Sequence, residues 1–142
     1  MKNQTLVLDT NVVLDLLVFA DAAARPIEAA LAESRVQWLA TQAMRDELER
    51  VLAYPQIVSR LAYYALEPAQ VLGRFDGHVR IVDVPPKAPV TCSDADDQKF
   101  IDLAVAHKCL LLSKDAAVLS MAKRLAALEV LAAVAMPPAD AA

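Results

Sequence analysis

The sequence has little of several residue types on which small proteins often rely. Among its 142 residues there are two cysteines, two histidines and two glycines, and aromatic residues make up 5%. Cys92 and Cys109 are too few for a disulfide framework, and we expect both thiols to be reduced. No C-x-x-C pair and no H-E-x-x-H pattern is present, which argues against a zinc site.

A long hydrophobic run is also missing. Charged residues interrupt the apolar stretches before they reach the ~18 residues that a membrane-spanning helix needs. The first nine residues, MKNQTLVLD, contain no apolar segment followed by a small-residue cleavage site, as a signal peptide would. We therefore predict a cytoplasmic protein that does not enter a membrane.

The balance of charge and hydrophobicity points to a compact acidic domain. The net charge is −4, which argues against a protein that coats nucleic acid through a basic face. It is compatible with an enzyme whose acidic site is neutralised by bound metal. Hydrophobic residues make up 57%, enough for one large core. We assign residues 1–136 to a single domain and 137–142 to a short C-terminal tail.

Short apolar segments alternate with amphipathic ones along the whole chain. The expected strands are residues 5–9, 36–40, 78–84, 109–113 and 128–134. The expected helices are residues 11–21, 25–34, 41–54, one or two within 56–77, and then 94–108 and 114–126. This alternation predicts an α/β fold of three layers, in which helices flank a central, mostly parallel sheet of four or five strands.

Polar residues follow two of the expected strands at the point where each ends. In LVLDTNVVL, Asp9 comes directly after three apolar residues, and Ser113 and Asp115 end or follow the strand at 109–113. Ligands of parallel α/β sheets bind at the carboxyl ends of the strands. We therefore expect these three side chains at one edge of the sheet.

Helical phase places further acids near the same edge. Glu47 lies on the inward margin of its helix, about 60° from the apolar Met44, and Asp97 shares a face with Ile101. Asp94 lies near the start of the latter helix. Each acid also has a simpler explanation, since acids in a first turn offset the helix dipole, Asp115 can cap a helix and Glu47 can be solvated.

Asp9 resists such an explanation. Burying a carboxylate costs several kcal/mol unless it is paired, protonated or bound to metal. No lysine or arginine lies near it in the strand, although a distant one could fold against it. Together with the other acids it forms an oxygen-only set of ligands, which suits Mg²⁺ or Mn²⁺.

One or two such ions can activate a water and stabilise the leaving oxygen of a phosphodiester. The site therefore predicts hydrolysis of a nucleic-acid backbone. We expect Thr10, Asn11 and Ser113 to hold waters or to orient the acids. Capping of the following helix is an equally good explanation for Thr10.

Three segments of the sequence resemble the PIN-domain family: residues 6–17, LVLDTNVVLDLL, residues 46–55, DELERVLAYP, and residues 94–119, DADDQKFIDLAVAHKCLLLSKDAAVL. They are most similar to the bacterial subgroup described as toxin components of toxin–antitoxin pairs. The resemblance implies a Mg²⁺- or Mn²⁺-dependent endoribonuclease that acts on RNA and has a cognate antitoxin. It also implies a set of metal-binding and supporting residues, namely Asp9, Glu47, Asp97 and Asp115, with Asp94 as an additional acid and Asn11 and Ser113 in support.

Some positions depart from the family pattern. Lys114 stands where many relatives have glycine or arginine, and TCSD at residues 91–94 stands where relatives often have an arginine. These differences concern substrate contact rather than the acids. The alanine-rich segment 20–34 permits close helix packing, in the core or against a second copy or an antitoxin.

Two other functions compete with a nuclease. A phosphotransfer domain would use Asp9 as a nucleophile, but the second acid that such domains carry two residues later is Asn11 here. A catalytically silent PIN fold that binds a protein or RNA is the other alternative. The intact set of four acids argues against it, and the acidic net charge favours a protein partner.

Overall fold

A parallel sheet of five strands forms the centre of the structure, a computed structural model that describes residues 4–137. The strands are β1 (Gln4–Leu8), β2 (Val36–Ala40), β3 (Val79–Ile81), β4 (Leu110–Leu112) and β5 (Leu131–Ala133). They lie in the order β3-β2-β1-β4-β5, and all neighbouring pairs are parallel. This confirms the predicted α/β fold, with β1 as the central strand.

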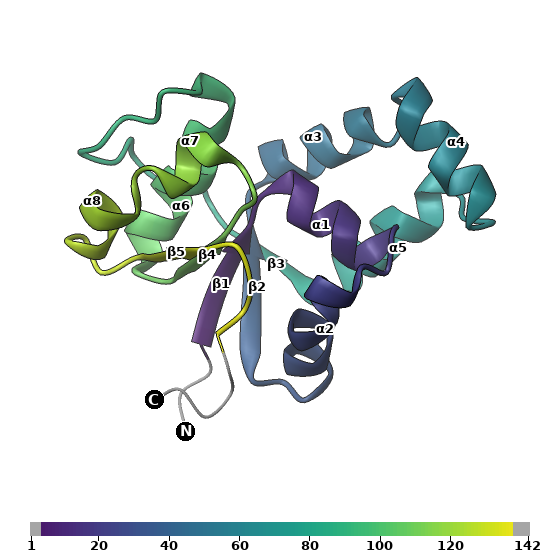
Figure 1. Ribbon diagram of the computed structural model, residues 1–142, viewed down its shortest axis with the longest axis horizontal. Coiled ribbons are helices and arrows are strands. Elements are labelled where there is room, and N and C mark those ends of the chain that lie inside the picture. Colours follow the sequence, from purple (N-terminus) through teal and green to yellow (C-terminus); the bar gives the residue numbers. More distant parts are fainter. Residues whose placement is uncertain (1–3, 138–142) are drawn as a thin grey trace.

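Helices cover both faces of the sheet and make three layers (Figure 1). On one side lie α1 (Thr10–Leu17), α2 (Arg25–Ala32), α3 (Gln42–Val51), α4 (Pro55–Tyr63) and α5 (Pro68–His78). On the other side lie α6 (Gln98–His107), α7 (Ala116–Leu119) and α8 (Ala122–Ala126). Short 3-10 helices, η1 (Ala22–Ala24) and η2 (Ala95–Asp97), precede α2 and α6.

Most of the expected helices are shorter in the structure, as two of them illustrate. The helix expected over 11–21 ends at Leu17, since Ala20 adopts a left-handed backbone with φ of 48°. The helix expected over 114–126 divides into α7 and α8. There the Met121 N–H bonds to the Val118 oxygen three residues back, a tighter turn that interrupts the α-helical series.

The register of the central strands positions the polar residues at their ends. Leu6, Val7 and Leu8 are at most 2% exposed, because helices cover both faces of β1. Leu8 pairs with Leu112 across the β1–β4 ladder. The next residues, Asp9 and Ser113, therefore leave the sheet side by side.

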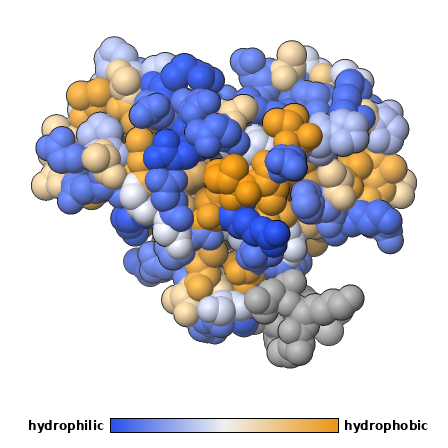
Figure 2. Space-filling view, turned by 180° about the vertical axis from the view of Figure 1, so that it is seen from behind, coloured by the Kyte–Doolittle hydropathy of each residue, from blue (hydrophilic) through white to orange (hydrophobic). Residues whose placement is uncertain are grey.

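The surface and the chain ends add little to the picture of the core. No helix among residues 4–137 is long and apolar enough to cross a membrane. On the face seen in Figure 2, apolar residues gather near the middle, among hydrophilic ones.

The domain boundary at residue 136 stays a prediction, and residues 138–142 of the expected tail lie outside the described residues.

Candidate metal centre

Asp9 is buried at the end of β1, at the N-cap position of α1, and is 5% exposed. Its side chain makes no capping bond to the helix. Instead its Oδ2 accepts a hydrogen bond of 2.6 Å from the Ser113 hydroxyl. Burial raises the pKa of Asp9, as do the charges of Asp115 and Glu47, while the Ser113 bond opposes them. The folded chain thus holds this carboxylate in an environment that disfavours its charge.

Three carboxylates meet at the carboxyl edge of the sheet. Asp9, Asp97 and Asp115 each offer an oxygen, and these oxygens lie within 4.8 Å of one another. Within residues 4–137, no lysine or arginine forms an ion pair with any of the three. We call this group the carboxylate cluster, and no cationic side chain among the described residues pairs with it.

Asp97 has the least satisfied side chain of the cluster. It is 7% exposed, and its Oδ2 is buried without a hydrogen-bond partner. Burial raises the pKa of Asp97 to about 7, and contact with Asp115 and the charges of Asp9 and Asp94 add to the effect. An orphaned buried carboxylate oxygen is costly unless a proton or a cation binds it.

Asp115 caps a helix and also belongs to the carboxylate cluster. Its Oδ1 accepts a hydrogen bond of 2.9 Å from the Ala117 N–H, so it caps α7. Its own N–H donates to the Ser113 hydroxyl at 3.0 Å. Because Ser113 also donates to Asp9, it links two acids of the cluster and fixes their separation.

The loop before α6 carries Asp94 and Asp97 to the site. The Gln98 side chain accepts a hydrogen bond of 2.6 Å from the Cys92 N–H and donates one of 3.0 Å to the Val90 oxygen. Asp94 is exposed and caps η2, accepting from the Asp96 N–H. It lies outside the carboxylate cluster and acts on it as a neighbouring charge of Asp97.

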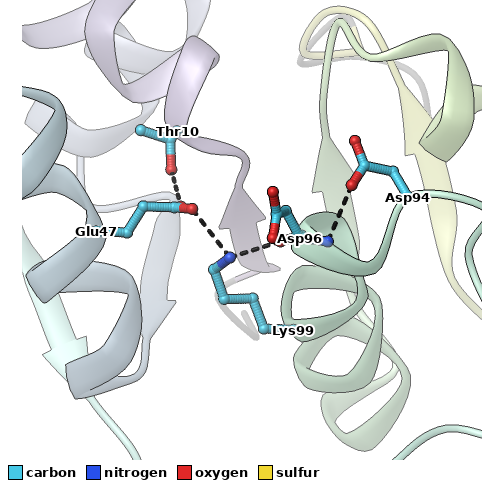
Figure 3. A network of polar contacts seen from close by, with 5 residues as sticks. All are labelled: Thr10, Glu47, Asp94, Asp96 and Lys99. Carbon is cyan, nitrogen blue, oxygen red and sulfur yellow. Dashed lines mark hydrogen bonds and ion pairs between the residues drawn. The ribbon is translucent and has the colours of Figure 1, made fainter. Parts of the chain in front are cut away.

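Glu47 belongs to a polar network with Thr10 and Lys99, which Figure 3 shows. The Thr10 hydroxyl donates to its Oε2 at 2.6 Å, and the Lys99 ammonium donates to its Oε1 at 3.0 Å. Glu47 is not among the acids whose oxygens converge within 4.8 Å. Thr10 is the first residue of α1 and follows the N-cap residue Asp9, so its hydroxyl supports Glu47 rather than capping the helix.

Two groups near the site were missed from the sequence. The first is Lys99, although its place in DADDQK, beside three acids, is a signal that could have found it. The second is Asp15, 7% exposed, which pairs with Lys114 at 2.6 Å. Lys114 thus pairs with Asp15, and no lysine or arginine among residues 4–137 forms an ion pair with Asp9. Asn11 has a buried amide oxygen without a partner among residues 4–137.

The carboxylate cluster fits a hard divalent cation. It offers only oxygen atoms, and in the part of the chain that the structure describes it has no cationic partner and one of its oxygens has no hydrogen-bond partner. Mg²⁺ and Mn²⁺ prefer such ligands. The neighbouring Cys92 thiol and the two histidines do not belong to the cluster, so the ligand chemistry does not favour zinc.

The chain has a three-layer parallel α/β fold with acids at the carboxyl edge of its central strands. This combination defines a class of domains that carry an acidic site. The sequence matches the PIN-domain family over residues 5–127, and the chain belongs to that family. Among solved structures, the chain is similar to one in VapBC2 from Rickettsia felis bound to a DNA fragment from their promoter. The TM-score is 0.59 at 12% identity, covering 91% of this chain and 98% of that one, a likeness of fold. No curated protein matches the chain in sequence.

Proposed function

We propose that this PIN-domain protein is an endoribonuclease that depends on Mg²⁺ or Mn²⁺. The observation that carries the proposal is the carboxylate cluster of Asp9, Asp97 and Asp115, whose oxygens lie within 4.8 Å of one another and which pairs with no lysine or arginine among residues 4–137. Without a cation these acids would repel a phosphodiester. A divalent ion held by them supplies an activated water and stabilises charge on the leaving oxygen.

The residues around the cluster hold the acids in place for that task. Ser113 donates to Asp9 and accepts from the Asp115 backbone, so both acids keep one orientation. The Ala117 N–H does the same for the Asp115 carboxylate. Asp97 is held by burial at the start of α6, and one of its carboxylate oxygens converges with those of Asp9 and Asp115. Such preorganised ligands lose little freedom when a cation binds.

RNA as substrate and an antitoxin as partner are further parts of the proposal. The motifs that resemble bacterial PIN-domain toxins support both, and a likeness in fold to a chain of the VapBC2 complex supports a protein partner. Apolar side chains on and beside α4 are exposed: Val58 is 48%, Tyr54 46% and Tyr63 81% exposed. They offer a surface for an antitoxin or for a second copy. We place this activity in the cytoplasm.

Cleavage of defined RNA and DNA strands of the same sequence tests the proposal. Wild-type protein with Mg²⁺ or Mn²⁺ should cut RNA internally, and EDTA should stop the reaction. Asp97→Asn should lose the activity, whereas Asp96→Asn, whose exposed side chain lies outside the carboxylate cluster, should retain it. Cleavage by Asp97→Asn at the wild-type rate, or cleavage in EDTA, would overturn the proposal.

A further inference from the structure

The ammonium group of Lys99 lies against the acidic edge of the sheet, near the N-terminus of α6, where the helix dipole disfavours a cation. Lys99 is the second residue of α6, and a helix N-terminus carries partial positive charge. Its Nζ nevertheless lies 3.0 Å from Glu47 Oε1, 2.5 Å from the Asp96 backbone oxygen and 5.0 Å above the Phe100 ring. Figure 3 shows it reaching from α6 to Glu47 on α3. These contacts hold the ammonium between the two layers.

Glu47 is already engaged at both of its oxygens. Thr10 donates to Oε2 and Lys99 to Oε1. The Glu47 and Lys99 side chains are 20% and 28% exposed, so solvent only partly screens the pair. A divalent ion that approached Glu47 Oε1 would meet the positive charge of the Lys99 ammonium, which lies 3.0 Å from that oxygen. Electrostatic repulsion therefore opposes a cation there.

The carboxylate cluster differs from Glu47 in this respect. Among residues 4–137, Asp9, Asp97 and Asp115 converge without a paired lysine or arginine, whereas Glu47 stands outside them and is paired with Lys99. A two-metal site needs ions about 3.5–4 Å apart with carboxylates for each. In this chain the acid that would hold the second ion is paired with lysine.

We propose that Lys99 takes the place of a second divalent ion, so that the chain binds one ion, at the carboxylate cluster. This inference rests on the proposed metal-dependent nuclease function. The ammonium has three N–H donors, of which Glu47 and the Asp96 oxygen accept two. Among residues 4–137 the third has no hydrogen-bond acceptor, so it can donate to a phosphate oxygen of the substrate, to which Lys99 would offer fixed positive charge.

The number of bound ions tests the proposal independently of activity. Mn²⁺ binding is measured by calorimetric titration and by electron paramagnetic resonance, in which two neighbouring Mn²⁺ ions give a spin-coupled spectrum. Wild type should bind one Mn²⁺ per chain. Lys99→Met should bind two with a coupled spectrum, and Lys99→Met/Glu47→Gln should return to one. Melting in EDTA checks that each variant folds, and Lys99→Gln serves if the methionine variant does not.

Lys108→Met is the matched control. Lys108 forms a Lys–Glu pair of 2.8 Å with Glu129, but both side chains are about two-thirds exposed and neither lies in the site. This variant should bind one Mn²⁺, as wild type does. Lys99→Arg should also bind one, because it keeps the charge.

The outcomes separate this inference from the proposed function. One ion in wild type and one in both Lys99→Met and Lys99→Gln would overturn the role of Lys99 and leave the metal site intact. Two ions in wild type would overturn it as well. Absence of Mn²⁺ binding in every variant would overturn the proposed metal-dependent function and this inference together.

Discussion

Asp9, at the N-cap of α1, and Asp15, in the second turn of the same helix, are buried almost equally, but the groups that they contact differ in charge. Asp9 is 5% exposed and Asp15 is 7% exposed. Asp15 is paired with the Lys114 ammonium at 2.6 Å. Asp9 instead accepts a hydrogen bond from the uncharged Ser113 hydroxyl, also at 2.6 Å. Burial alone therefore does not mark a binding site. The absence of a protein cation marks it, because a buried, unpaired charge needs a ligand.

The same difference divides the acidic edge itself. Glu47 has Lys99 as a counter-charge, and the carboxylate cluster has none. The paired acids, Asp15 and Glu47, should act mainly on stability or on the surroundings of the site. The unpaired acids should act on metal binding and cleavage. Each prediction below tests this division.

Replacing Asp9 should have the largest effect on activity. Asp9→Asn removes a carboxylate of the cluster but keeps its shape. Loss of a residue that only hydrogen-bonds to a metal ligand can cost roughly 100-fold in activity. Because Asp9 is itself a proposed ligand, its loss should lower metal-dependent cleavage by more than that. Thermal stability in EDTA should be equal or higher, because the substitution relieves repulsion with Asp115. Cleavage rates and melting curves of the variant check both parts.

Asp15→Asn is the matched variant for that experiment. It removes an equally buried carboxylate from the same helix, and cleavage by the folded protein should stay within a few-fold of wild type. A loss of cleavage equal to that of Asp9→Asn would show that pairing with lysine does not separate the two acids.

The pH dependence of stability should identify Asp97 as an unpaired acid. Its pKa is raised to about 7 from 3.8, so between pH 4 and pH 7 the folded chain keeps a proton that the unfolded chain has released. The free energy of unfolding therefore decreases as pH rises through this window. In EDTA, Asp97→Asn should melt at least about 3 °C above wild type at pH 8, and the gap should close near pH 4.

Melting curves in EDTA from pH 4 to pH 8 measure this gap. Asp96→Asn, which changes an exposed neighbour, controls for the loss of one negative charge. A gap that is the same at every pH would contradict the assignment, since a buried carboxyl that titrates near 7 must give a pH-dependent difference.

Much of this arrangement could be predicted from the sequence, because strand ends and helical phase fix directions. The apolar run before Asp9 indicated a buried central strand, and the ladder between Leu8 and Leu112 places Ser113 beside Asp9. Phase also placed Asp97 toward the sheet. In each case the position follows from local geometry and from the parallel topology.

The pairing of charges could not be predicted in the same way. Helical phase gives the direction of the Glu47 side chain but not the distance between α3 and the end of β1. The separation of Glu47 from the carboxylate cluster therefore could not be predicted. Lys99 and Lys114 lie in other layers than the acids they pair with, and long flexible side chains leave several partners open. Which acid is neutralised depends on the packed structure.

Loss of the ion pair between Asp15 of α1 and Lys114 should lower the free energy of unfolding moderately. Asp15→Ala removes the bond to Lys114, whose side chain is 44% exposed and can return to water. The free energy of unfolding should fall by about 1 kcal/mol, which lowers Tm by about 2–4 °C. Thermal melts of Asp15→Ala, Lys114→Met and the double variant measure the coupling. If the losses simply add, the two side chains do not stabilise each other.

Thr10 should have the smallest effect of the residues at the edge. Thr10→Val removes the hydroxyl that donates to Glu47 Oε2 and leaves the Lys99 ion pair in place. Because a charged partner remains, Glu47 keeps its position, and cleavage should fall by less than about 5-fold, the equivalent of about 1 kcal/mol for one hydrogen bond. Thr10→Ser, which retains the donor, should cleave at the wild-type rate. A loss of cleavage in Thr10→Val as large as that in Asp9→Asn would show that Thr10 acts together with the carboxylate cluster. One hydrogen bond to Glu47, which is already paired with Lys99, is too weak to cause so large a loss.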